Sequence, residues 1–121
     1  MTYCSGLNAC QFCVGSHGAV AKSFGVDPDL LEALLASDDF EMVEPKLRPL
    51  LALAKKLTQA PATVYSGDVA AIIDAGWNEH TAHDAVCCIA AINFGNRLTD
   101  GHGVKGSPEN WNLSIRQVMV S

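Results

Sequence analysis

Two cysteines and a histidine near the start of the chain have the types and spacing of a redox site. Cys10, Cys13 and His17 occupy positions i, i+3 and i+7. On an α-helix, at about 100° per residue, the three side chains fall within roughly 60° of arc on one face. Sulfurs this close can form a disulfide, and His17, one turn beyond Cys13, can accept its proton. The pattern therefore predicts a dithiol redox centre.

Two other interpretations of these residues remain open. The Cys-x-x-Cys pair with His17 could bind zinc, with His80, His83 or His102 as a distant fourth ligand. Structural zinc sites usually have a second clear pair of ligands, and the sequence contains none. Alternatively, the three residues are partly buried and have no chemistry. A histidine on the face that carries both thiols favours the redox interpretation, so no metal is expected.

The motif needs a helix, and its flanking residues predict where that helix begins and ends. Asn8 is a favourable N-cap, and Gln11 three residues later can complete a capping box. This would put Cys10 in the first turn, where the helix dipole favours a thiolate. Gly25 predicts that the helix ends near Phe24.

The rest of the chain is patterned as helix, so we expect one all-α domain over residues 1–121, a compact bundle of about five helices. The N-caps expected for later helices are Asp27, Ser66 and Asn78. Leucines predict an apolar helical face over residues 44–58, where Pro49 either kinks the helix or marks a later start. Residues 108–121 are expected to form a short irregular tail.

The remaining cysteines are expected to carry no chemistry. Five cysteines in a reducing compartment do not form a disulfide framework. Cys4 receives no role, and Cys87 with Cys88 lies in an apolar segment where both are expected to be buried. Arg97 and Asp100, three residues apart, are expected to form an ion pair.

Composition indicates an oligomer and excludes several partners. The 121 residues are 49% hydrophobic and only 17% charged, so we expect another subunit of a homo-oligomer to cover part of the surface. The net charge of −5 argues against nucleic acid and anionic membranes. There is no signal peptide and no apolar run of the ~20 residues that a membrane helix needs, which predicts a cytoplasmic protein.

The motif Asn8-x-Cys10-x-x-Cys13-x-x-x-His17-Gly18 resembles the core motif of the AhpD-like (carboxymuconolactone decarboxylase-like) family, in its peroxidase-related, alkylhydroperoxidase branch. Residues 47–61, 68–77 and 94–100 resemble later parts of that family, so the likeness spans residues 7–104. It implies an oligomeric all-α protein that reduces alkyl hydroperoxides without a bound cofactor. It also implies a thiol, lipoyl or thioredoxin-like reductant. Cys10 and Cys13 would be the redox pair and His17 the proton acceptor.

The chain departs from this family before the motif. The family usually has a glutamate on a preceding helix, about a dozen residues before the first cysteine, whereas this chain has nine residues before Cys10, none of them acidic. We therefore expect the preceding helix to be absent, through truncation or divergence, and an apolar groove to be left for another subunit. His17 would lose an orienting partner, so an inactive oligomeric scaffold is the alternative function.

The two thiols are expected to have different roles. The helix dipole favours a thiolate at Cys10, whereas His17 favours one at Cys13. An explicit base outweighs the dipole, so Cys13 is the predicted nucleophile and Cys10 the resolving thiol.

Overall fold

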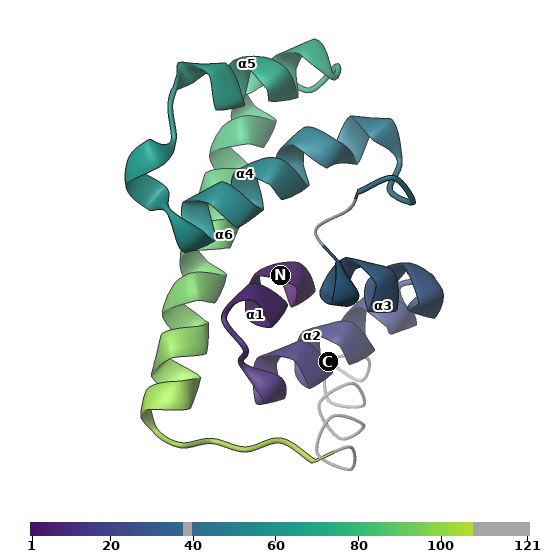
Figure 1. Ribbon diagram of the computed structural model, residues 1–121, viewed down its shortest axis with the longest axis vertical. Coiled ribbons are helices and arrows are strands. Elements are labelled where there is room, and N and C mark those ends of the chain that lie inside the picture. Colours follow the sequence, from purple (N-terminus) through teal and green to yellow (C-terminus); the bar gives the residue numbers. More distant parts are fainter. Residues whose placement is uncertain (38–39, 108–121) are drawn as a thin grey trace.

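The computed structural model describes residues 1–37 and 40–107 (Figure 1). Within these residues the chain forms six α-helices: α1 (Thr2–Leu7), α2 (Gln11–Ser23), α3 (Pro28–Ala36), α4 (Arg48–Gln59), α5 (Ser66–Asp74) and α6 (Glu79–Gly101). Short 3-10 helices occupy Pro45–Leu47 and Pro61–Thr63, and the described ranges contain no strand. The predicted all-α class is confirmed. No helix was expected before the motif, yet the structure has a short one there, α1, which is six residues long and contains no acidic residue.

Helix α1 is short but central. It contacts α2, α3, α4 and α6, while α6 runs along one side of the molecule and also contacts α2, α4 and α5 (Figure 1). Tyr3 and Cys4 of α1 are buried in the core with Leu53, Ile72 and Ile89. Apolar burial of this kind is the main favourable contribution to folding, so the segment before the motif is part of the core.

Several helix ends form where the sequence predicts them. The Asp27 carboxylate accepts the backbone N–H of Asp29 at 2.9 Å, and the Asn78 amide oxygen accepts that of Thr81 at 2.8 Å. Both are N-caps that satisfy free N–H groups of the first turn. Gly25, after α2, has the left-handed backbone (φ +85°) that follows a helix end.

Other helix starts differ from the prediction. Ser66 is the first residue of α5, and the N-cap is Tyr65, whose N–H donates to the Asp68 carboxylate at 2.9 Å. Pro49 lies in the first turn of α4, which begins at Arg48, so it marks a later start and no kink. Neither difference changes the order of the helices.

The exposed face of α6 corrects the prediction for two cysteines. Cys87 and Cys88 are exposed. Helix α6 packs on the core through one face only, with Ala82, Ile89 and Ile92 buried. Outside that face the helix also exposes large apolar residues, namely Val86, Phe94 and Leu98. An exposed apolar face of this length is typical of an interaction surface.

Two further predictions concern the C-terminal tail and membrane-spanning helices. Residues 108–121, expected to form an irregular tail, lie outside the described residues. Among the described helices none is both long and apolar enough to cross a membrane.

Candidate redox site

The structure joins Cys10 and Cys13 in a disulfide at the start of α2. Their Cα atoms are 5.3 Å apart, within the usual range for disulfides. Cys10 is the residue that precedes the helix, at its N-cap, and Cys13 lies in the first turn. The Cys10 side chain is fully buried and Cys13 is 5% exposed. Any reagent from solvent therefore meets Cys13 first.

The end of α1 determines where Cys10 lies. The Ser5 carbonyl accepts the N–H of Cys10 at 3.0 Å, and the Gly6 carbonyl accepts the N–H of Ala9 at 2.9 Å. Ala9 has a left-handed backbone, with φ +55°. These features define a Schellman motif, in which the two hydrogen bonds satisfy the last carbonyls of a helix. The chain reverses there, and the next helix starts directly after Cys10.

Asn8 has a different role from the predicted N-cap. It is the C-cap residue of α1, and its amide donates to the Asn93 side chain of α6 at 2.9 Å. Asn93 in turn donates to the Thr58 hydroxyl of α4 at 2.9 Å and accepts from Arg97 at 3.0 Å. These bonds fix the loop before the disulfide to α4 and α6. Arg97 also donates to the Asn93 carbonyl, so the expected ion pair with Asp100 is not formed.

A second polar contact to α6 comes from Ser5, the residue whose carbonyl accepts the N–H of Cys10. The Ser5 hydroxyl donates to the Asn96 side-chain oxygen at 3.0 Å, and both side chains are fully buried. The Asn96 Nδ2 is buried and has no hydrogen-bond partner among the described residues. Asn96 is not among the site residues predicted from the sequence. The helical spacing could have identified it, because Asn96 is a polar residue that follows Ala82, Ile89 and Ile92 on the face of α6 that packs on the core.

His17 lies one turn beyond Cys13 on α2 and is half-buried. Burial lowers the pKa of its imidazole, and the positive charge of the Met1 amino group lowers the pKa further. A lowered pKa keeps the ring neutral at neutral pH, the form that can accept a proton. His17 has no hydrogen bond to any of the described residues, and no carboxylate orients it. Its role as the proton acceptor remains a prediction.

The other three histidines, His80, His83 and His102, each contact a different group. His80 is 3.6 Å from the Asp84 carboxylate on the exposed start of α6, and His83 Nε2 is 3.5 Å from the Cys87 sulfur. The His102 ring contacts the Leu98 carbonyl at 2.7 Å. Within residues 1–37 and 40–107, no three His, Cys, Asp or Glu side chains gather as a metal ion would require. The structure therefore does not assemble the alternative zinc site.

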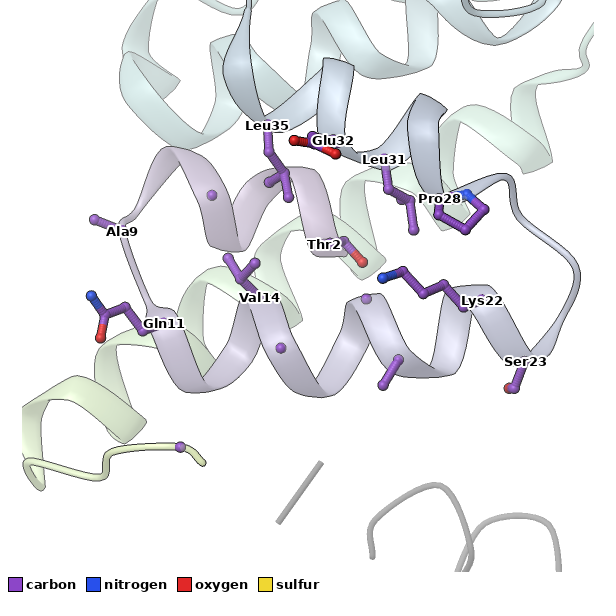
Figure 2. Close-up of a pocket in the computed structure, with 15 residues that line it drawn as sticks. Thr2, Ala9, Gln11, Val14, Lys22, Ser23, Pro28, Leu31, Glu32 and Leu35 are labelled. Atoms are coloured by element: carbon purple, nitrogen blue, oxygen red, sulfur yellow. The ribbon is translucent and has the colours of Figure 1, made fainter. Parts of the chain in front are cut away.

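A groove of about 1140 Å³ lies between α1, α2 and α3 (Figure 2). It is lined mainly by small and apolar residues, among them Gly6, Val14, Gly15, Gly18 and Leu31. In Figure 2 the Lys22 side chain lies along the groove, opposite Leu31. The groove reaches Gln11, next to the disulfide. We expected an apolar groove in place of a missing helix, whereas this groove is lined partly by α1 itself. That another subunit fills it remains a prediction.

Comparison with known proteins gives a likeness to a solved structure. No family model matches the sequence, and no curated protein matches it. Among solved structures the chain is similar to an uncharacterized peroxidase-related protein from Silicibacter sp. TM1040, with 25% sequence identity and a TM-score of 0.82. The match covers 89% of this chain and 56% of that one, so this chain spans little more than half of that protein's length. The likeness supports the all-α fold and the peroxidase-related part of the resemblance.

Proposed function

We propose that this chain is a dithiol oxidoreductase of the AhpD-like type that reduces alkyl hydroperoxides. The observation that carries the proposal is the Cys10–Cys13 disulfide at the start of α2, one turn before a half-buried imidazole. A disulfide at a helix start can cycle with a dithiol, because the helix dipole stabilises a thiolate there. The peroxidase-related neighbour supports peroxide as the oxidant.

The proposed cycle starts from the dithiol and consumes one hydroperoxide. His17 takes the proton of the Cys13 thiol, and the Cys13 thiolate attacks the terminal oxygen of the hydroperoxide. The O–O bond breaks, the alcohol leaves with a proton, and Cys13 becomes a sulfenic acid. The Cys10 sulfur then attacks the Cys13 sulfur, which forms the disulfide and releases water. An external dithiol of the lipoyl or thioredoxin-like class reduces the disulfide by two thiol exchanges.

The different exposure of the two sulfurs supports these roles. Cys13 is buried but keeps 5% exposure and lies one turn from His17, which suits the thiol that meets the hydroperoxide and the base. Cys10 is fully buried, which suits a thiol that reacts only with its neighbour. Among the described residues no carboxylate is hydrogen-bonded to His17, and we therefore expect slow turnover.

We place this activity in the cytoplasm, where thiols can regenerate the dithiol, and in a homo-oligomer. The exposed apolar face of α6, which includes Val86, Phe94 and Leu98, supports a partner subunit. An inactive oligomeric scaffold is the second candidate, and the same exposed face of α6 supports it.

Turnover of an alkyl hydroperoxide with excess dihydrolipoamide distinguishes these functions. The reference protein carries Cys87→Ser and Cys88→Ser, which removes the exposed thiols that could react on their own. We expect turnover in this protein and none after a further Cys13→Ser. If both consume peroxide at the same rate, the peroxidase proposal fails and the scaffold remains.

A trapping experiment tests which sulfur attacks. In a Cys10→Ser protein, peroxide should leave a sulfenic acid on Cys13 that a dimedone probe labels, because the resolving thiol is missing. In a Cys13→Ser protein the same treatment should leave Cys10 unlabelled. Labelling of Cys10 alone would reverse the assignment.

A further inference from the structure

Asn96 is buried in α6, and half of its hydrogen-bonding capacity is unused. Its side chain is fully buried in α6, and its oxygen accepts from the Ser5 hydroxyl at 3.0 Å. Its Nδ2 has no partner in the part of the chain that the structure describes. Leaving a buried donor unpaired is costly, so such a group in a folded protein calls for an explanation.

Ser5 fixes the position of this donor, because it hydrogen-bonds to both Asn96 and Cys10. The Ser5 hydroxyl holds the Asn96 oxygen, and the Ser5 carbonyl accepts the N–H of Cys10 at 3.0 Å. Asn96 and Cys10 are thus joined through a single residue, where α1, α2 and α6 meet. Asn93, three residues earlier on α6, holds Asn8 of the same loop. Successive turns of α6 therefore face the loop that delivers Cys10.

Reduction of the disulfide would create the acceptor that this donor lacks. A disulfide sulfur is neutral and accepts hydrogen bonds weakly, whereas a thiolate is charged and accepts them strongly. Cys10 is fully buried, so a thiolate there has no access to water and depends on a protein donor. We infer that Asn96 Nδ2 donates a hydrogen bond to the Cys10 thiolate of the reduced protein.

This hydrogen bond assists the release of Cys10 during reduction. An external thiolate attacks the Cys13 sulfur, the S–S bond breaks, and its electron pair goes to Cys10, which leaves as a thiolate. The product is a mixed disulfide on Cys13, and the Asn96 amide stabilises the leaving thiolate without transferring a proton. The inference rests on the redox cycling of the proposed function, but it does not require peroxide to be the oxidant.

Two substitutions separate the donor from the packing of the side chain. Asn96→Leu removes both polar ends with the same number of side-chain heavy atoms, and the Ser5 hydroxyl keeps the Met1 carbonyl, 3.2 Å away, as an acceptor. Asn96→Asp keeps an oxygen for Ser5 but replaces the donor with a second oxygen. Neither substitution changes the ionisable groups on the surrounding helices. These groups include the Met1 amino group before α1, Cys4 of α1, His17 and Lys22 of α2, Lys55 and Lys56 of α4, and Arg97 and Asp100 of α6.

The measurements are the thiol pKa and the redox equilibrium of the pair, both in the Cys87→Ser and Cys88→Ser protein. Thiolate absorbance in the ultraviolet, followed against pH, gives the pKa. Equilibration with dithiothreitol buffers gives the fraction of disulfide. Because a hydrogen bond to a charged group is lost, we expect Asn96→Leu to weaken thiol ionisation about tenfold to hundredfold. It should also shift the equilibrium at least about tenfold toward the disulfide, and Asn96→Asp should shift both further.

A purely structural role for Asn96 would give a different result. The oxidised Asn96→Leu protein should unfold at the same or higher denaturant concentration than the reference, because it buries no unpaired donor. If it does not fold, Asn96→Ala provides the same test of the amide. Unchanged thiol ionisation and an unchanged redox equilibrium in a folded variant would overturn the inference. The Asn96 variants could show the expected shifts while the reference protein does not turn over peroxide. In that case the peroxidase proposal fails and the role of Asn96 is supported.

Discussion

Ala9 is the one residue other than glycine with a left-handed backbone in the described chain, and it lies in the turn that delivers Cys10. This conformation costs an L-residue about 1–2 kcal/mol, because Cβ approaches the carbonyl oxygen. Glycine avoids the clash but loses about 0.5–1 kcal/mol more conformational entropy on folding. Ala9 is exposed, so removing its methyl group sacrifices no buried contact. We therefore expect Ala9→Gly to stabilise the protein by about 0.5–1 kcal/mol.

The same substitution in a helix should have the opposite effect. Ala52 is exposed within α4, and Ala52→Gly there should destabilise the protein by about 1 kcal/mol. Urea unfolding of both oxidised variants beside the parent protein measures the two changes. A destabilised Ala9→Gly with an unchanged m-value would contradict the Schellman geometry and, with it, the explanation of how Cys10 reaches the helix start.

Three further predictions concern pH and the core. Because burial lowers the pKa of His17, the unfolded chain binds the proton more tightly, so stability should fall as the pH drops below about 6.5. His17→Gln should reduce this loss of stability, measured by denaturant unfolding at pH 5 and pH 8. The same pH dependence in both proteins would refute the assignment of the loss to His17. Leu53→Ala should cost about 3 kcal/mol in the same assay, since Leu53 is 1% exposed, and a cost below about 1 kcal/mol would place Leu53 outside the core. The hydrogen bond from Lys56 lowers the pKa of Asp68, so Lys56→Met should destabilise the protein above pH 4 and progressively less as Asp68 is protonated; a difference that grows at acid pH would contradict this.

Helix ends set by local chemistry could be predicted from the sequence. Asp27 before Pro28, and Asn78 before α6, cap helices through bonds to residues two or three positions away. Asn8 has the same intrinsic preference, but the Schellman turn of α1 places it at a helix C-terminus instead. The prediction failed there because it assumed no helix before the motif.

Which face of a helix is buried depends on tertiary packing, which periodicity alone does not determine. Cys87 and Cys88 lie among apolar residues, yet α6 turns them outward and packs on the core through another face. The pairing of Ser5 with Asn96 joins residues 91 positions apart. Spacing near Cys10 could not reveal it, although an asparagine on the buried face of α6 marked the position.

The central claim is that Cys10 and Cys13 pass from dithiol to disulfide when a hydroperoxide is reduced. The most direct test mixes the fully reduced protein, with Cys87 and Cys88 replaced by serine, with one equivalent of an alkyl hydroperoxide. Thiol titration and mass spectrometry of the peptides then follow the reaction. The account predicts the loss of two thiols per alcohol formed, with the new disulfide joining Cys10 to Cys13. Oxidation of the thiols no faster than that of free cysteine would contradict this claim. So would a disulfide that involves Cys4.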